Sequence, residues 1–289
     1  KSAGIIRNSG IELALNWSDN LPNGFSYTVG TNIATLKNEV RDLYGQKYID
    51  GGSAEFRQRS IVGQPLLAFF GYEVLGVYQN DAHVESDPVA AALNEADPEG
   101  DAIVPGDFIY KDVNSDGVID GDDRVVLGSY FPTFTYGVNL SANYKNFSLS
   151  VNLMGQNGAK ILNRKRGEVI WTPDGNMDAD LAKGRWHGDG TSDAYPSSAG
   201  LRKGWNQKMS TYFVEDGDFF RVQNIQLSYT LKGPQLGIQK FPETRISLTA
   251  DRPLTLFNYN GFNPEVENGI DMQTYPIPAV YTVGLSVKF

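Results

Sequence analysis

An acidic stretch between residues 112 and 123 has the spacing of a cation-binding loop. Oxygen-bearing side chains stand at positions 1, 3, 5, 9 and 12 of twelve, and Gly117 stands at position 6. This is the pattern of an EF-hand calcium loop, in which the glycine permits the sharp turn. The expected direct ligands are Asp112, Asn114, Asp116 and Asp123, with Val118 offering its backbone carbonyl and Asp120 acting through a water molecule. The sequence therefore predicts a structural Ca²⁺ ion that stiffens a loop, with a merely acidic turn as the alternative.

Catalytic residues are harder to find. The two histidines, His83 and His187, stand far apart in the sequence, and neither belongs to a zinc or hydrolase motif. Glu265 and Glu267 resemble a glycosidase pair, because on an extended segment they share a face about 6.6–6.8 Å apart. Two exposed loop carboxylates are the simpler interpretation, and we expect no enzyme.

Three tryptophans fall in one polar region rich in Gly and Asp, at Trp171, Trp186 and Trp205. They could stack on sugar rings or contact a partner protein. A long loop commonly packs on its own side chains, so we favour a small core inside the loop.

Composition narrows the class of protein. The 289 residues carry a net charge of −9, contain no cysteine and are 12% aromatic. The negative charge disfavours nucleic acid as a partner, since phosphate binding needs a basic surface. The sequence has no run of 18 apolar residues, so a transmembrane helix is not expected. A membrane protein with this composition would have to be a β-barrel.

Period-two alternation of apolar and polar residues is the dominant pattern. In the last segment, Tyr281–Phe289, each odd-numbered residue is apolar and each even-numbered residue is small or polar. Lys145 and Asn146 form a two-residue turn between two such segments, which places Tyr144 opposite Phe147. The expected strands are 11–17, 25–35, 134–144, 147–155, 225–231, 244–251 and 280–289.

Two folds present such strands: a transmembrane antiparallel β-barrel and a soluble, calcium-dependent carbohydrate-binding β-sandwich. The small uncharged residues on the polar faces favour a crowded barrel lumen, because a solvated face would carry more Lys and Glu. Short turns alternate with long loops at 36–133, 156–218 and 255–279, as in outer-membrane barrels, whose long loops are external. This trace assumes no further strand pairs inside 36–133, an irregular segment in which Asp87 is expected to cap a short helix that begins at Pro88. The trace brings the C-terminus to the periplasm.

Seven strands cannot close a single-chain barrel, whose strand count is even, and unpaired edges are untenable in lipid. We therefore expect 1–289 to be the C-terminal part of a longer barrel that begins before Lys1. The remaining strands would come from another chain or fragment.

Several ordered segments together resemble the SusC/RagA family of TonB-dependent outer-membrane transporters of Bacteroidetes. They are residues 8–13, 71–79, 105–120, 123–128, 215–229 and 259–266, with Phe289 at the end. The resemblance implies the last third of a 22-stranded barrel, with the plug domain absent from this chain. It also implies an importer of oligosaccharides or oligopeptides, with a SusD-like lipoprotein lid and energy from TonB–ExbB–ExbD.

Overall fold

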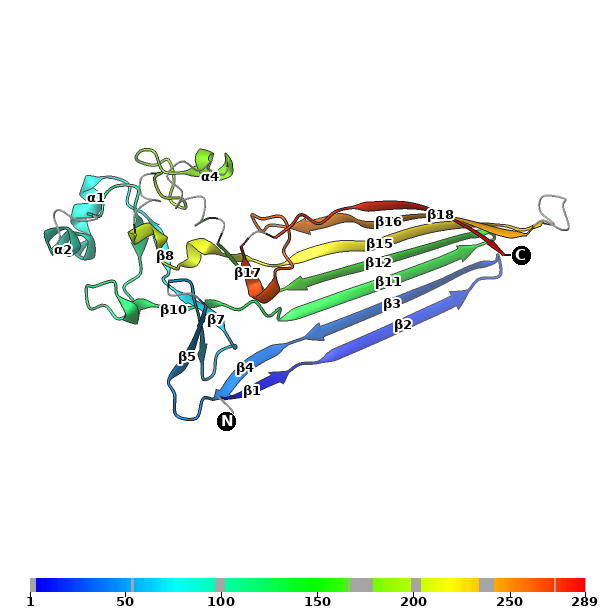
Figure 1. Ribbon diagram of the computed structural model, residues 1–289, viewed down its shortest axis with the longest axis horizontal. Helices are drawn as coiled ribbons and strands as arrows, with labels where there is room; N and C mark the ends of the chain where they lie inside the picture. Colours follow the sequence, from blue (N-terminus) through cyan, green and yellow to red (C-terminus); the bar gives the residue numbers. More distant parts are fainter. Residues whose placement is uncertain are drawn as a thin grey trace.

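The computed structural model describes residues 4–52, 55–96, 102–164, 166, 179–198, 204–233, 242–272 and 274–288. Its main feature is a seven-stranded antiparallel sheet with the order β18-β16-β15-β12-β11-β3-β2, which we call the wall (Figure 1). Each expected strand is present. The strands are β2 (Glu12–Asn20), β3 (Phe25–Thr35), β11 (Phe134–Tyr144), β12 (Phe147–Asn157), β15 (Phe219–Leu231), β16 (Glu243–Phe257) and β18 (Val280–Lys288).

The wall is a meander, since strands adjacent in the order are consecutive members of the wall along the chain. β2, β11 and β15 end, and β3, β12 and β16 begin, at one end of the wall, where β18 also ends (Figure 1). The two-residue turn is as predicted, with Tyr144 opposite Phe147 and Lys145 in the left-handed region at φ 54°. The chain between the other strands gathers at the opposite end (Figure 1).

Two strands of the wall are longer than predicted because a bulge interrupts their alternation. Between β15 and β16 the register shifts at Val222/Asn224, so Gln223 has no direct partner. On the β16 side, Arg252 and Pro253 fall in the same irregularity, and Arg252 has a φ of 50°. A bulge adds residues to a strand without ending its pairing. The strands therefore continue through it, although the pattern of alternation does not.

The segment 36–133 is not the irregular excursion that the sequence suggested. It contains β4 (Lys37–Asp42), β5 (Tyr48–Gly52), β6 (Arg57–Ile61), β7 (Ala68–Gly71), β8 (Val74–Val77), β9 (Phe108–Tyr110) and β10 (Val125–Gly128). The order β10-β7-β6-β5 makes a second sheet, β8 pairs with β9, and β4 pairs with β1 (Ile5–Ser9). The assumption of no further strand pairs in this segment was thus wrong. None of the added strands joins the wall, so the seven-strand trace stands.

Two short helices also lie in this segment, α1 (Asp81–Ser86) and α2 (Pro88–Ala96). The predicted cap of α2 is present, because the Asp87 carboxylate accepts the backbone N–H of Val89 at 2.9 Å. The helix α1 had not been expected. None of the helices in the described part of the chain is long and apolar enough to cross a membrane.

The other two long connections add short elements at the same end of the molecule. They are β13 (Lys160–Asn163), α4 (Ala179–Gly184), η3 (Trp205–Gln207), η4 (Thr211–Phe213), β14 (Val214–Asp216), η6 (Glu267–Gly269) and β17 (Ile270–Asp271). We call the described residues of the three excursions the loop head. Its main core is formed by buried aromatic and aliphatic residues drawn from 36–133 and 156–218, including Phe69, Phe108, Leu162 and Phe213.

Candidate functional site

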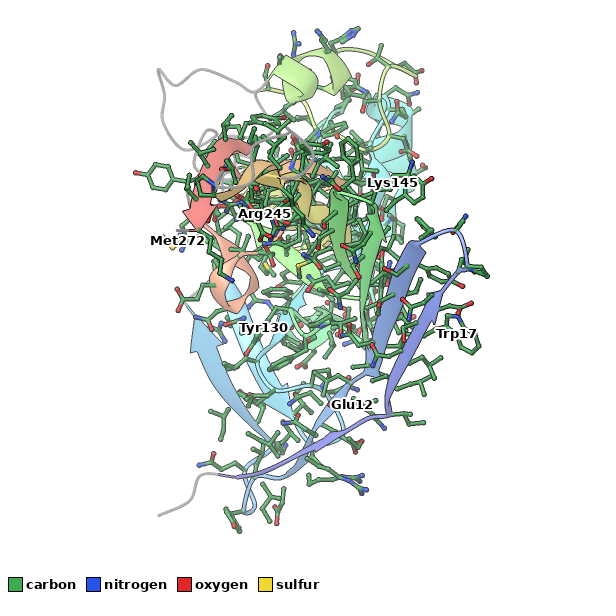
Figure 2. All side chains as sticks on the ribbon, turned by 90° about the vertical axis from the view of Figure 1, so that its right-hand side faces the viewer. Glu12, Trp17, Tyr130, Lys145, Arg245 and Met272 are labelled. Atoms are coloured by element: carbon green, nitrogen blue, oxygen red, sulfur yellow. The ribbon has the colours of Figure 1, made fainter. Side chains whose placement is uncertain are left out.

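The wall has two faces of opposite chemistry. Cross-strand register puts Ala142, Leu149, Leu227, Leu248 and Val283 in one row across five strands. Neighbouring rows on this face are also mostly apolar, and Figure 2 shows Trp17 projecting outward from β2. Several of these side chains are widely exposed, with Val283 at 76%, Tyr281 at 74% and Trp17 at 66%.

No second sheet covers this apolar face within the described residues. An exposed apolar patch beyond a few hundred Å² marks an interaction or membrane surface. A β-sandwich would instead bury the apolar face of each sheet against the other. The observed single layer therefore contradicts the sandwich alternative and fits the lipid-facing side of a barrel.

An aromatic row borders the apolar face at the short-turn end. Phe25, Tyr144, Phe147 and Tyr229 lie directly opposite one another on four adjacent strands. The rings of Phe147 and Tyr229 have centroids 4.6 Å apart. Aromatic girdles occupy the two interfacial levels of membrane barrels, where amphipathic rings meet the headgroups.

The opposite face of the wall is polar and mostly uncharged. A groove of about 370 Å³ on it is bordered by carboxamide side chains, including Asn32, Asn139, Asn152 and Gln156. Gln223, at the bulge, also borders this groove, and its buried Oε1 has no hydrogen-bond partner within the described residues. Carboxamides both donate and accept hydrogen bonds, so this face can bind neutral polar groups.

The segment after β16 folds over the head end of the polar face. Arg221, which is 4% exposed, lies in line with Thr255 and Met154 on that face. Its Nη1 donates to Glu265 Oε2 at 2.5 Å. Glu265 is thus held in an ion pair, while Glu267 begins η6. The ion pair gives Glu265 a structural role. The geometry does not support Glu265 and Glu267 as a glycosidase site.

The loop head holds the remaining residues that the sequence singled out. Trp186 and Trp205 pack against the main core, as expected for a loop core, and Trp205 Nε1 donates to the Phe108 carbonyl at 2.9 Å. Trp171 lies outside the described residues. His83 packs edge-on against Tyr78, and His187 lies in an exposed turn, where its backbone N–H donates to Thr191 Oγ1 at 3.0 Å.

Backbone geometry in the acidic loop resembles that of a calcium loop. Asp112 accepts the backbone N–H groups of Ser115 at 2.6 Å and Gly117 at 2.8 Å, and Gly117 has the expected positive φ of 84°. Asp123 is fully buried and accepts from the backbone N–H groups of Val113 and Asp120.

The side chains of the loop test the fit further. Asn114 Oδ1 accepts the backbone N–H of Asp116, and Asp116 Oδ1 accepts that of Val118. Asp120 caps η1 (Gly121–Asp123). Within the described residues, no three Asp, Glu or His side chains approach closely enough to form a metal cluster by themselves. The backbone conformation of the loop is compatible with Ca²⁺. A complete ligand shell would also need the Asn114 and Val118 oxygens, and calcium binding stays a prediction.

Two buried tyrosines tie separate elements of the head together. Tyr78 donates to Asp87 Oδ2 at 2.6 Å, and Tyr259 donates to Asp271 Oδ2 at 2.5 Å. Burial, followed by the hydrogen bond to the carboxylate, raises the pKa of both phenols. Lys208 is also enclosed, with Nζ 4.1 Å from the Trp205 ring, and burial lowers its pKa.

No sequence pattern indicated the arginines that hold the loops together or line their cavities. Arg166 pairs with Glu215 at 3.1 Å, Arg124 with Glu55 at 3.3 Å, and Arg164 borders a cavity of about 430 Å³. Each contact joins residues far apart in the chain. Their only signal in a single sequence is an arginine in a loop, which is indistinguishable from a solvated one.

The two-faced, single-layered wall with long connections at one end defines a membrane β-barrel segment. The whole chain is 28% identical to TonB-dependent receptor P3 of Formosa agariphila, and 23% identical to TonB-dependent receptor SusC of Bacteroides thetaiotaomicron. The chain spans 29% and 27% of the lengths of these relatives. No protein-family model matches the chain.

Solved structures show the same fold. The chain superposes with a TM-score of 0.74 on a structure of the RagAB peptide importer in the 'open-open' state, at 20% identity, over 99% of this chain and 29% of that chain. The 'closed-closed' state gives a TM-score of 0.73. The resemblance to the SusC/RagA family and the barrel fold are confirmed. The curated relatives are receptors, which agrees with the prediction that this chain is not an enzyme.

Proposed function

We propose that this chain forms part of the barrel wall and the loop head of an active nutrient importer in a bacterial outer membrane. The importer takes up oligosaccharides or oligopeptides with a SusD-like lid lipoprotein and is driven by TonB–ExbB–ExbD. The remaining strands pair with this chain to close the barrel, and the plug lies inside it. The loop head faces the outside, and the C-terminus lies on the periplasmic side.

The observation that carries this proposal is the two-faced wall. Its apolar face needs lipid, and its polar face needs an enclosed polar space. Both outer edges, on β2 and β18, lack a partner strand within the described residues. Because unpaired edges are excluded from lipid, further strands are required. The similarity to TonB-dependent receptors over the whole chain supports the assignment of that barrel to nutrient import.

The test is purification of the intact protein from its native outer membrane in detergent, followed by identification of the chains that copurify. We expect a heat-modifiable barrel together with a SusD-like lipoprotein. Uptake of labelled oligosaccharides and labelled oligopeptides by cells with and without TonB then defines the cargo. The proposal fails if the protein stays in solution without detergent, or if deleting TonB leaves the uptake of both unchanged.

We also propose that the loop 112–123 binds one structural Ca²⁺ through Asp112, Asn114, Asp116, Val118, Asp120 and Asp123. The turn geometry around Asp112 and Gly117 supports this. Amide hydrogen exchange of the loop in the intact protein, with Ca²⁺ and with chelator, tests it. We expect faster exchange in chelator than in Ca²⁺. Asp116→Ala should remove this difference between the two conditions. Equal exchange in both conditions would refute calcium binding.

A further inference from the structure

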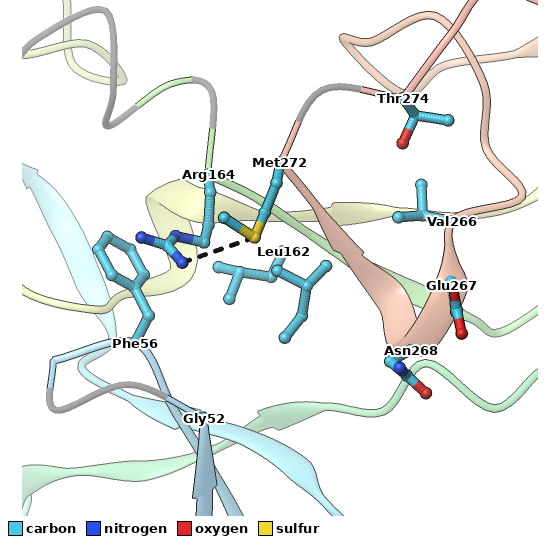
Figure 3. A pocket seen from close by; sticks show the side chains of 10 residues that line it. Gly52, Phe56, Leu162, Arg164, Val266, Glu267, Asn268, Met272 and Thr274 are labelled. Carbon is cyan, nitrogen blue, oxygen red and sulfur yellow. Dashed lines mark hydrogen bonds between the residues drawn. The ribbon is translucent and has the colours of Figure 1, made fainter.

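A cavity of about 430 Å³ lies in the loop head beside η6 (Figure 3). Each of the three excursions contributes to its lining: Phe56 follows β5, Leu162 and Arg164 come from β13 and its end, and Met272 follows β17. The cavity is near the head end of the polar face, because the same segment carries Glu265, the partner of Arg221 on the wall. It belongs neither to the acidic loop nor to the groove on the wall.

Among the described residues of the lining, Arg164 is the only cation. Its Nη1 has a single, weak contact, with Met272 Sδ at 3.9 Å (Figure 3). Its Nε is buried and has no hydrogen-bond partner among the described residues. The guanidinium carbon lies 5.2 Å from the centroid of the Phe56 ring. A guanidinium has five N–H donors, so most of its capacity for hydrogen bonds is unused here.

Five other arginines of the chain are paired with carboxylates. The pairs are Arg57 and Arg59 with Asp50, Arg124 with Glu55, Arg166 with Glu215 and Arg221 with Glu265. The chain contains 34 acidic residues against 25 basic ones, so a shortage of carboxylates does not explain the exception. Arg164 is positioned two residues before Arg166, yet it faces the cavity and has no acidic partner among the described residues.

The lining also indicates what kind of anion would fit. Phe56 lies next to the guanidinium, and Leu162, Val266 and Ile270 are further apolar residues of the lining. Glu267, the one acid among the described lining residues, is exposed and lies across the cavity from Arg164 (Figure 3). A guanidinium fork matches a carboxylate in a bidentate manner. A strongly hydrated inorganic anion would lose its water against apolar walls, whereas an apolar group next to the carboxylate would gain from them.

We propose that Arg164, with Phe56, Leu162 and Met272, forms a binding site for an organic carboxylate carried next to an apolar group. The carboxylate takes the guanidinium, and the apolar group lies against Phe56, Leu162 and Ile270. Such a ligand could be the end of a peptide with an apolar side chain. A uronic acid carries the same carboxylate on a polar ring and is the less suitable source.

The test is equilibrium binding to the intact protein in detergent, with N-acetyl-L-leucine as the probe. N-acetyl-L-leucinamide has the same shape without the charge, and glucuronate has the charge on a polar ring. We expect the acid to bind at least about tenfold more tightly than either. Arg164→Gln should lower the affinity for the acid at least tenfold. Arg41→Gln, which removes an exposed arginine that pairs with Glu39 outside the cavity, should leave it unchanged.

A second pair of variants guards against loss of the fold. Met272 is 51% exposed, so its replacement leaves the core intact. Met272→Glu places a carboxylate within reach of Arg164 and should abolish binding of the acid. Leu75→Glu, which places a carboxylate at a position that is 57% exposed and outside the cavity, should retain it. The proposal is overturned if the amide or glucuronate binds as well as the acid, or if Arg164→Gln and Met272→Glu both bind normally. Binding does not depend on transport, so a negative result here leaves the importer proposal standing.

Discussion

The wall and the loop head differ in where their apolar side chains lie. In the head, Phe69, Phe108 and Phe213 are fully buried. In the wall, Val283, Leu285 and Tyr281 are each more than 70% exposed. The head therefore buries its apolar side chains in a core of its own, as a protein in water does. The wall gains its apolar stabilisation only from a surrounding that is itself apolar.

The difference also appears in how each region is connected. Wall strands pair with neighbours in chain order, through long ladders such as the eleven pairs between β11 and β12. The head instead joins distant segments by ion pairs and buried aromatic contacts, such as Arg166 with Glu215 and Phe108 with Tyr212. Changes in the head should therefore loosen loops while leaving the barrel closed, and changes in the wall should do the reverse.

The largest expected effect comes from emptying the core of the head. Phe108 is fully buried, with its ring centroid 5.0 Å from that of Tyr212 in a different excursion. Phe108→Ala should destabilise the head by about 3–5 kcal/mol. Hydrogen exchange should rise across the head, while the heat-modifiable barrel persists.

Leu75→Ala is the matched control in the same excursion, because Leu75 is 57% exposed. It should change stability by less than about 0.5 kcal/mol. Simultaneous loss of the head and the barrel in Phe108→Ala would show that the two regions fold as one unit and would end the comparison.

A lysine introduced into the wall should have different effects on its two faces. Val283 and Thr282 are adjacent on β18, both exposed, and point to opposite faces. Val283→Lys should cost roughly 2–4 kcal/mol if it lies near the membrane midplane, because lipid does not solvate the ammonium group. Thr282→Lys should be tolerated. The temperature at which the barrel unfolds in lipid vesicles measures both, and equal losses would refute the assignment of the faces.

The wall could be predicted from the sequence because its pattern is long and local. Each strand has at least seven residues of alternation, and the Lys145-Asn146 turn sets the register of one hairpin. Even there, the alternation fails at Gln223 and at Arg252-Pro253, where the bulge shifts the phase, so β15 and β16 were predicted too short. The bulge depends on how β15 and β16 pair, and the sequence of one strand alone does not show this.

The head and its cavity could not be predicted because they depend on contacts between distant segments. Its strands are as short as two residues, as in β17, too few for alternation to be read. The cavity joins Arg164 to Met272, which lies 108 residues further along. The acidic loop was visible because its residues are consecutive, and the cap Asp87 was visible because it acts on Val89, two residues away.

Alkaline pH should loosen the head before the wall. The folded pKa values of Tyr78 and Tyr259 are raised, so above pH about 10 the unfolded chain loses these protons while the folded head keeps them. Stability is then fully present below pH 10 and falls as the pH rises, by about 1.4 kcal/mol per pH unit for each tyrosine.

Hydrogen exchange of the head between pH 9 and 11, corrected for its intrinsic pH dependence, measures this fall. Tyr78→Phe should make it shallower, whereas Tyr275→Phe, at a position that is 88% exposed, should not. A fall that is equally steep in all three proteins would show that these buried phenols do not control it.

The smallest expected effect lies at the tip of the β11–β12 hairpin, where the wall is farthest from the head. Lys145 has a φ of 54°, a conformation that costs a side chain more than it costs glycine. Lys145→Gly should therefore raise the stability of the barrel by roughly 0.5–1 kcal/mol. Asn146→Gly should lower it instead, because Asn146 Nδ2 donates to the Thr230 carbonyl at 2.6 Å and ties the turn to β15. The unfolding temperatures of the two variants in vesicles should move in opposite directions, and hydrogen exchange in the head should stay unchanged. If both temperatures move in the same direction, the flexibility of the turn backbone sets the effect, and the separate roles of Lys145 and Asn146 do not.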